Sequence, residues 1–349
     1  YSNAELGSIH KSWDKCSVRL ALAFPDLYEL GMSNLGIQQL YHVVNQQEDL
    51  LCERVFSPDI DLEELLRAKK LPLFSLESKH ALSEFELLGV SLQHELTFTN
   101  FLVLLELAGI SLYAKDRKPA EPYVFAGGHG AFNPIPLTPF LDFAVIGEGE
   151  EVLIEIMNFF KENRSLKRQD FLKKLAEQVK GIYVPSINNP AVKRIIKDLN
   201  TMAYPEQPII PFIETVHDRL AVEIMRGCAH GCRFCQAGYA CLPQREVKKD
   251  VVLKRIAQGL KNTGYDEVSL LSLSSGDHSE IGPLVKELLA TYQNSKINIS
   301  LPSLHIESLS PELAAATQTT RHAGITLAPE AGSQRLRDVL NKKITEADI

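Results

Sequence analysis

The residues best suited to chemistry in this sequence are three cysteines within one stretch of eight residues. They form the run Cys228-Ala-His-Gly-Cys232-Arg-Phe-Cys235, directly after a short apolar segment and a glycine. Three thiolates at these spacings can wrap a [4Fe–4S] cluster and leave its fourth iron open. An open iron can bind a reacting molecule. The spacing therefore predicts a catalytic metal centre whose ligands are Cys228, Cys232 and Cys235.

Two other uses of these cysteines stay open. A structural zinc site needs a fourth ligand, which His230 or Cys241 could supply. A cluster that only transfers electrons normally has four cysteine ligands. In both cases the protein would be a non-catalytic iron–sulfur or zinc binding module. The other cysteines, Cys16, Cys52 and Cys241, are scattered, which indicates a reducing compartment rather than a disulfide framework and predicts that each is dispensable for iron content.

Length and composition predict an ordinary globular protein of two domains, since the chain has 349 residues, 45% of them hydrophobic. The net charge of −7 gives no basic field, so charge does not indicate a nucleic-acid partner, although it does not exclude one. No apolar run is long enough to cross a membrane, and residues 1–13 lack a signal-peptide pattern. We expect a cytoplasmic protein without a membrane partner.

The first half of the chain alternates short apolar runs with segments of helical period, which predicts a parallel α/β sheet covered by helices. After an extension over residues 1–17, we expect a doubly wound, flavodoxin-like domain over residues 18–180. Its predicted strands are Val18–Phe24, Leu51–Phe56, Leu87–Leu92, Tyr123–Ala126 and Phe143–Ile146. Its predicted helices are Asn34–Asn45, Asp61–Ala68, Leu96–Ala108 and Glu150–Asn163.

The loops after these strands are rich in glycine and small polar residues. They are Pro25–Gly31, Ser91-Leu92, Gly127–Gly130 and Gly147–Glu150. Ligands of doubly wound domains bind at the carboxyl ends of the strands, where glycine lets the backbone approach them. The alternative is that these glycines only end strands and cap helices.

A proline-rich connector is expected over residues 181–219, followed by a second βα series over residues 220–349. Its predicted strands are Leu220–Met225, Glu267–Ser272, Ile297–Leu301 and Gly324–Ala328, and its predicted helices are Lys249–Asn262, Ile281–Tyr292 and Pro311–Gln318. Four such units do not close a barrel. The pattern predicts a partial (β/α) barrel, truncated at its carboxyl end.

The cysteine run and its place after the first strand of a βα series resemble the radical S-adenosylmethionine (SAM) superfamily. That resemblance implies a [4Fe–4S] cluster that binds SAM and cleaves it reductively to a 5′-deoxyadenosyl radical. It also implies SAM contacts on the loops that follow the strands. A capped turn is the alternative for Asp277, and a helix-opening acid with an ordinary surface arginine explains Glu330 and Arg335 equally well. The implied SAM-binding residues are Phe234, Ser275, Gly276, Asp277, Ser300, Glu330 and Arg335.

The doubly wound domain is similar to the cobalamin-binding domain that precedes the barrel in a cobalamin-dependent subgroup. The run from Phe24 to Gly36 resembles a bacterial family of that kind whose substrate is not established and whose members are longer. The implied cobalamin contacts are Asp26, Tyr28, Gly31, Ser91, Gly127 and Gly128. Tyr28 stands where the subgroup's Asp-x-His-x-x-Gly motif has its cobalt-binding histidine. Either cobalamin binds without that imidazole, or only the fold is kept; His94 and His129 are not assigned.

These resemblances lead us to expect a radical SAM enzyme with an unknown substrate and a reducing electron donor. With cobalamin, the implied reaction is methyl transfer to an unactivated carbon. Without it, a rearrangement, an oxidation or a sulfur insertion stays open. The hypothesis that the protein modifies RNA or another macromolecule rests on family analogy alone.

Overall fold

The computed structural model describes residues 5–306 and 328–349 and divides into two compact units. The first unit consists of Tyr1–Ile196, Ala203–Pro205 and Ile209–Val216. The second consists of Lys197–Met202, Glu206–Pro208 and His217–Ile349. The short alternating pieces belong to the proline-rich connector, which contributes to both units.

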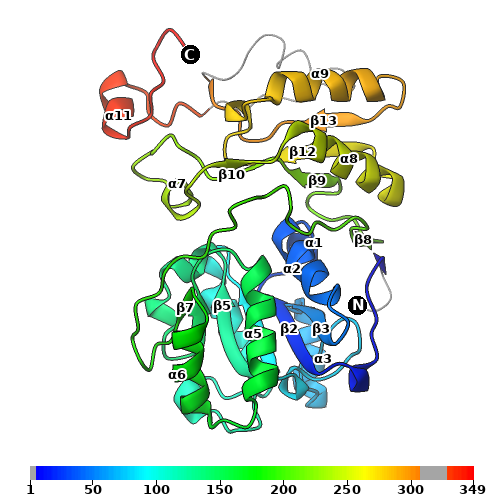
Figure 1. Cartoon of the computed structure of the whole chain (residues 1–349), viewed down its shortest axis with the longest axis vertical. Coiled ribbons are helices and arrows are strands. Elements are labelled where there is room, and N and C mark those ends of the chain that lie inside the picture. Colours follow the sequence, from blue (N-terminus) through cyan, green and yellow to red (C-terminus); the bar gives the residue numbers. More distant parts are fainter. Residues whose placement is uncertain (1–4, 307–327) are drawn as a thin grey trace. The chain divides into compact units, whose positions relative to one another are not determined.

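The first unit is built on a six-stranded sheet in the order β3-β2-β4-β5-β6-β7 (Figure 1). The strands are β2 (Val18–Phe24), β3 (Leu50–Phe56), β4 (Leu87–Ser91), β5 (Tyr123–Gly127), β6 (Phe143–Val145) and β7 (Ile182–Tyr183). The first five are parallel, and their order is that of flavodoxin-like sheets. The predicted fold class and its five strands are confirmed, because nearly continuous apolar runs mark strands that are buried on both faces.

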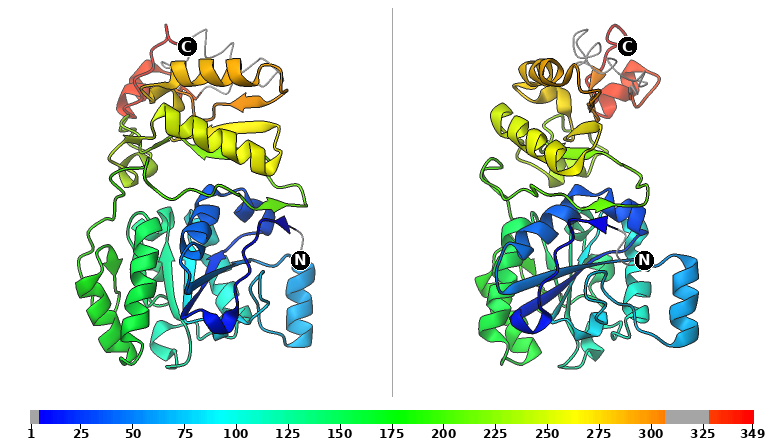
Figure 2. Two further views of the ribbon diagram at one scale, coloured as in Figure 1. Left: turned by 45° about the vertical axis from the view of Figure 1, so that its right-hand side comes forward. Right: turned by 90° about the vertical axis from the view of Figure 1, so that its right-hand side faces the viewer.

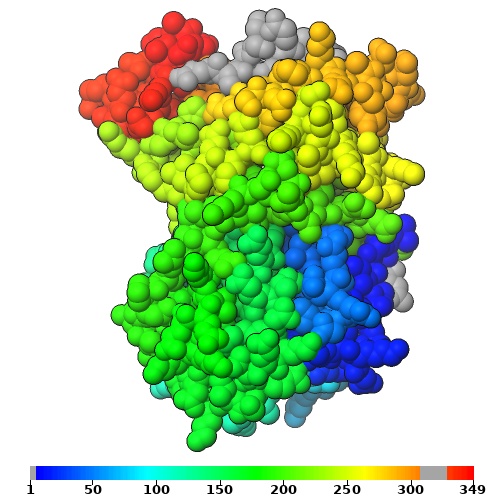
Figure 3. Space-filling view, viewed as in Figure 1, coloured from blue at the N-terminus to red at the C-terminus, as the bar shows by residue number. Residues whose placement is uncertain are grey.

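Helices cover both faces of this sheet. The helices are α1 (Tyr28–Met32), α2 (Leu35–Asn45), α3 (Ile60–Lys69), α4 (Phe98–Leu107), α5 (Glu150–Asn163) and α6 (Arg168–Gln178). Buried side chains of α2, α5 and α6 form one core cluster with the sheet, and those of α3 and α4 form a second. Figure 2 shows α3 and the green pair α5 and α6 on opposite sides of the sheet, and in Figure 3 the blue and green residues of α2, α5 and α6 cover the front of this unit.

Five helices and strands of the first unit were not predicted. The segment Pro25–Gly31, expected to be a loop, contains most of α1, and α6 follows α5 closely. Strand β7 adds an antiparallel edge, and β1 (Glu5–Leu6) pairs with β8 (Ile210–Pro211). The strands β1, β7 and β8 and the helix α1 have two to five residues each, too few to show a period, so tertiary pairing decides them. Helix α6 has 11 residues and was missed although its length is sufficient for a helical period.

The second unit contains a parallel sheet in the order β13-β12-β9. Its strands are β9 (Leu220–Glu223), β12 (Glu267–Leu271) and β13 (Asn298–Ser300), with a separate antiparallel pair of β10 (Met225–Arg226) and β11 (Arg245–Glu246). Its helices are α7 (Ala237–Ala240), α8 (Lys249–Thr263), α9 (Ile281–Tyr292) and α11 (Gln334–Val339). The predicted helix Pro311–Gln318 and nearly all of the predicted strand Gly324–Ala328 lie outside the described residues.

Short 3₁₀ helices occupy several of the connections. They are η1 (Trp13–Lys15), η2 (Leu82–Glu84), η3 (Glu95–Thr97), η4 (Ala114–Asp116), η5 (His129–Phe132), η6 (Ile135–Leu137) and η7 (Ser275–Asp277). No helix in the described part of the chain is long and apolar enough to cross a bilayer.

A buried carboxylate joins two loops and a helix of the first unit. Asp142 accepts hydrogen bonds from Arg117 at 2.7 Å, from Arg168 at 2.8 Å and from the amide of Val124. Replacing Asp142 with asparagine should lower the free energy of unfolding by about 3 kcal/mol, because it leaves buried Arg117 without its counter-charge. Denaturant titration checks this, and Asp116→Asn, at a neighbouring exposed position, should change the free energy little.

Candidate functional site

The cysteine loop begins at a turn that requires glycine. The single strand predicted over Leu220–Met225 is divided at Ile224, where the chain leaves β9 and pairs with β11 as β10. Gly227 follows with a φ of +93°, and a Cβ there would come within 2.8 Å of the Pro243 carbonyl oxygen and 2.9 Å of that of Cys241. The turn and the lack of space exclude any side chain at this position. The backbone thus enters the loop of Cys228–Cys235 close to the β10–β11 pair.

All three cysteines of the loop are free thiols. Cys232 is buried, whereas Cys228 and Cys235 are half-buried. The amide of Gly238 in α7 donates a hydrogen bond to the Cys235 sulfur at 3.3 Å. Burial raises the pKa of Cys228, and the nearby negative charges of Asp277, Cys232 and Cys235 raise it further. As thiolates, the three sulfurs would repel one another unless a cation compensated their charge.

The chemistry of these donors fits a [4Fe–4S] cluster, whose irons take cysteine thiolates. Within residues 5–306 and 328–349, no three His, Cys, Asp or Glu side chains are placed to hold a single metal ion. A single zinc ion would draw every sulfur to about 2.3 Å from one point. A [4Fe–4S] cluster needs a wider spacing, because each thiolate binds a different iron. The three-thiol set fits such a cluster and provides no fourth cysteine ligand from the loop itself.

A histidine inside the loop contacts the loops that follow β12 and β13. The Nε2 atom of His230 lies 2.6 Å from a carboxylate oxygen of Asp277, and its ring stacks on that of His305 with centroids 3.9 Å apart. Burial, together with the charges of His230 and Lys342, lowers the pKa of His305 to about 4, so His305 is neutral near pH 7. From local sequence His230 could be predicted only as a possible zinc ligand, because the partner of a histidine in space is not visible there.

Asn341 fastens the same loop from the carboxyl end of the chain. Its side-chain amide donates to the backbone oxygens of His230 at 3.1 Å and Gly231 at 2.9 Å. Asn341 has a φ of 56°, which asparagine and glycine tolerate better than alanine.

Asn341→Gly should therefore keep the backbone conformation and lose both hydrogen bonds. We expect the amides of residues 228–235 to exchange with deuterium about tenfold faster, as the loss of one to two kcal/mol of local stability implies. Hydrogen exchange followed by mass spectrometry measures this. Unchanged exchange in the Gly variant would show that the two hydrogen bonds do not restrain the loop.

The predicted SAM residues lie on several loops of the second unit. Asp277 follows β12, and Glu330, with a φ of 68°, forms an ion pair of 3.4 Å with Lys342. Ser275 is buried, and its hydroxyl donates to the carbonyl oxygens of Leu270 and Pro302. The remaining positions are Phe234, exposed between Cys232 and Cys235, Gly276 in η7, Ser300 at the end of β13, and Arg335, exposed in α11. Their roles stay predictions, and Ser275 also joins the loops after β12 and β13.

Predicted cobalamin residues meet where the strand order of the first sheet reverses. Ser91 ends β4, while Gly127 ends β5 and its carbonyl accepts the amide of Leu92 at 2.8 Å. Gly128 has a φ of +90°, and a Cβ there would lie 2.4 Å from the Leu92 carbonyl oxygen. Gly128 thus lets the loops after β4 and β5 pack closely against each other, at the carboxyl edge of the sheet where doubly wound folds bind ligands.

The predicted cobalamin residues after β2 have two different environments. Asp26 lies in the loop at this edge of the sheet, whereas Tyr28 and Gly31 belong to α1 and pack against the sheet. Asp26 accepts the amide of Leu27, whereas the ring of Tyr28 packs edge-on against Phe56 with centroids 5.3 Å apart. A Cβ on Gly31 would lie 2.1 Å from the same Phe56 ring, so Gly31 allows the close approach of α1. Large exposed apolar side chains follow β2, β4 and β5, namely Leu27, Leu30, Leu96 and Ile135.

Two family profiles match this chain. Residues 36–185 match the profile described as radical SAM proteins, N-terminal, and residues 222–349 match that of the radical SAM superfamily. The α/β fold and the three-cysteine loop thus define a radical SAM protein with an N-terminal domain. The chain belongs to the radical SAM superfamily of enzymes, which use a [4Fe–4S] cluster and SAM.

Two curated proteins are similar in sequence. An uncharacterized protein of Methanocaldococcus jannaschii is 25% identical over 95% of this chain and 64% of its own length. The threonylcarbamoyladenosine tRNA methylthiotransferase of Treponema pallidum is 28% identical over 38% of this chain and 28% of its own length. The chain therefore spans less than two thirds of these relatives.

Solved structures share the fold at low identity. The cobalamin-dependent SAM radical enzyme OxsB, with aqua-cobalamin and SAM bound, matches with a TM-score of 0.60 and 14% identity over 95% of this chain and 46% of its own. The radical SAM methyltransferase TsrM from Kitasatospora setae, with cobalamin and [4Fe–4S] cluster bound, matches with a TM-score of 0.60 and 13% identity over 95% and 62%.

Proposed function

We propose that this protein cleaves SAM reductively at a [4Fe–4S] cluster and uses cobalamin to transfer a methyl group to an unknown substrate, the methyl coming from a second SAM molecule that leaves as S-adenosylhomocysteine. In this proposal residues 18–180 form the cobalamin-binding-like domain and residues 220–349 the radical SAM part. The observation that carries it is the loop of Cys228, Cys232 and Cys235, whose three thiols have the donor set of a cluster with one open iron.

The residues around the cluster have separate roles in this proposal. When bound, the cluster supplies an open iron for SAM and the electron that splits SAM into methionine and a 5′-deoxyadenosyl radical. The amide of Gly238 stabilises the negative charge on the Cys235 sulfur. Asp277 receives the ammonium group of the methionine part of SAM, and His230, at 2.6 Å, orients its carboxylate. Neutral His305 supports the His230 ring without adding charge.

Cobalamin binding is supported by the first unit and by the structural neighbours. OxsB and TsrM, which share the fold, hold cobalamin in their structures. Gly128 lets the loops after β4 and β5 pack closely together at the carboxyl edge of the sheet, and the exposed apolar side chains of Leu30, Leu96 and Ile135 follow β2, β4 and β5. Because Tyr28 packs on Phe56, we propose that cobalamin binds without a protein ligand from this position.

Anaerobic purification, iron reconstitution and chemical reduction with SAM test the proposal. We expect 5′-deoxyadenosine to form only when the cluster is present. In a parallel sample, hydroxocobalamin should raise the unfolding temperature followed through Trp13, the only tryptophan of the chain, because a ligand that binds only the native state stabilises it. A cluster-loaded protein that neither binds nor cleaves SAM would leave the non-catalytic binding module as the better account.

A second candidate is a cobalamin-independent reaction of the sulfur-insertion type. The similarity to a tRNA methylthiotransferase favours it, as does the absence of the cobalt-binding histidine at Tyr28. Stabilisation of the protein by cobalamin distinguishes the two candidate functions. Formation of 5′-deoxyadenosine without any stabilisation by cobalamin would support this second candidate. In both cases an external reducing donor supplies the electron.

A further inference from the structure

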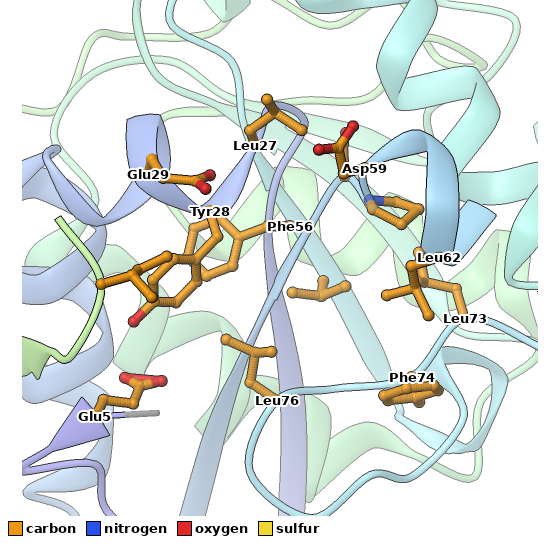
Figure 4. A pocket seen from close by; sticks show the side chains of 14 residues that line it. Glu5, Leu27, Tyr28, Glu29, Phe56, Asp59, Leu62, Leu73, Phe74 and Leu76 are labelled. Carbon is orange, nitrogen blue, oxygen red and sulfur yellow. The ribbon is translucent and has the colours of Figure 1, made fainter. Parts of the chain in front are cut away.

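The first unit contains a cavity that the proposed function does not use. It has a volume of about 230 Å³ and lies over the carboxyl end of β3, the edge strand of the sheet (Figure 4). Ser91, Gly127 and Gly128, which mark the switch point, follow β4 and β5 on the other side of β2, and none of them lines the cavity. A small molecule in this cavity would therefore occupy a site separate from those loops.

The walls of the cavity are apolar and partly aromatic. Tyr28 and Phe56 form an edge-on pair on one side, and Leu62 of α3, Leu73 and Phe74 line the other (Figure 4). Cavities with such walls bind small organic molecules, and this volume fits a body the size of one substituted ring. Aromatic faces also attract organic cations through their negative π-electron density.

The charged groups that line the cavity are all acidic. Glu29 and Asp59 both line it, and neither carboxylate has a cationic partner among the described residues. Asp59 caps α3 by accepting the amide of Ile60, so the helix dipole offsets part of its charge. Glu5, which also lines the cavity, is paired with Arg54 at 2.9 Å. No lysine, arginine or histidine lines the cavity, so its field is negative.

We propose that this cavity binds a small organic ammonium ion, a protonated amine attached to an aromatic or branched aliphatic body. The apolar walls receive the body, and the carboxylate of Glu29 pairs with the ammonium group. A neutral analogue would lack this ion pair, and an anion would be repelled.

Calorimetric titration of the full chain with phenethylamine, 2-phenylethanol and 3-phenylpropionate tests the charge preference. We expect the amine to bind about tenfold more tightly than the alcohol, since one such ion pair is worth about a factor of ten near a protein surface. The carboxylate should bind least. Higher salt should weaken binding of the amine and leave binding of the alcohol unchanged.

Three variants locate the binding. Leu62→Trp should fill the cavity and abolish binding of amine and alcohol, whereas Leu65→Trp, on the exposed face of the same helix, should leave both unchanged. Glu29→Gln should lower the affinity for the amine about tenfold and leave the affinity for the alcohol unchanged. Fluorescence of Trp13 verifies that the Glu29→Gln variant is folded, and circular dichroism does so for the tryptophan variants. Equal affinities for the three probes, no binding of the amine, or amine binding that survives Leu62→Trp would each overturn the proposal.

Discussion

Replacing Cys232 with alanine is expected to remove the cluster and all formation of 5′-deoxyadenosine. Cys232 is the buried member of the three loop thiols and the middle one in sequence. Two thiolates would remain, and no other cysteine of the loop could replace the missing one. Bound iron should therefore fall from about four atoms per chain to less than one after reconstitution. Cys228→Ala and Cys235→Ala should give the same result.

The matched control for this prediction is Cys241→Ala. Cys241 lies just beyond α7, and we expect its replacement to keep iron, sulfide and SAM cleavage at the level of the unchanged protein. Iron and sulfide analysis, visible absorption and an assay of 5′-deoxyadenosine are the measurements. Full iron content in Cys232→Ala would exclude the cluster assignment. Loss of iron in Cys241→Ala would instead indicate four protein ligands and no open iron for SAM.

Replacing Arg54 with methionine is expected to have the largest effect on the stability of the first unit. The Arg54 side chain is fully buried and lies 2.8 Å from Glu77, which is itself buried, and 2.9 Å from Glu5. It also lies over the Tyr41 ring at 4.8 Å. Burial alone would lower the pKa of Arg54, but the charges of Glu77 and Glu5 outweigh it and raise the pKa, so Arg54 stays charged.

The methionine variant keeps most of the apolar volume but leaves the Glu77 carboxylate buried without a counter-charge. Breaking a buried ion pair in this way costs about 3–5 kcal/mol of unfolding free energy. Denaturant titration followed by the fluorescence of Trp13, which stacks on His80 in the same unit, measures the change.

A second arginine provides the control for this ion pair. Arg67 also pairs with two glutamates, Glu63 and Glu106, but on the exposed surface, so Arg67→Met should change stability little. The double variant Arg54→Met with Glu77→Leu should recover part of the lost stability, because it removes the unpaired charge. Equal effects of the two arginine substitutions would contradict the importance of burial.

Much of the fold follows from local sequence. Five strands of the first unit are predicted within two residues of their observed bounds, because apolar runs of this length fit a sheet buried on both faces. These strands begin at Val18, Leu50, Leu87, Tyr123 and Phe143. Helix α5 begins and ends where predicted, since its apolar residues keep a helical period over 14 residues. The alternation of these elements predicts the doubly wound class.

Charged residues within those strands show where prediction from local sequence fails. Glu53 and Arg54 lie in the middle of β3, and both are buried. Their partners, Ser75 and Glu77, come from a loop more than twenty residues later. No periodicity relates such positions, so only the tertiary structure shows that these charges are paired.

The same division applies to the candidate site. The sequence by itself determined the three thiols, the glycine before them and the βα series that carries them, because cluster chemistry requires those residue types at short spacings. Only the tertiary structure decided that His230 bonds to Asp277, that Asn341 fastens the loop, and that Tyr28 packs on Phe56. These contacts join residues that are distant along the chain. They depend on how strands and loops meet in space, which local spacing does not encode.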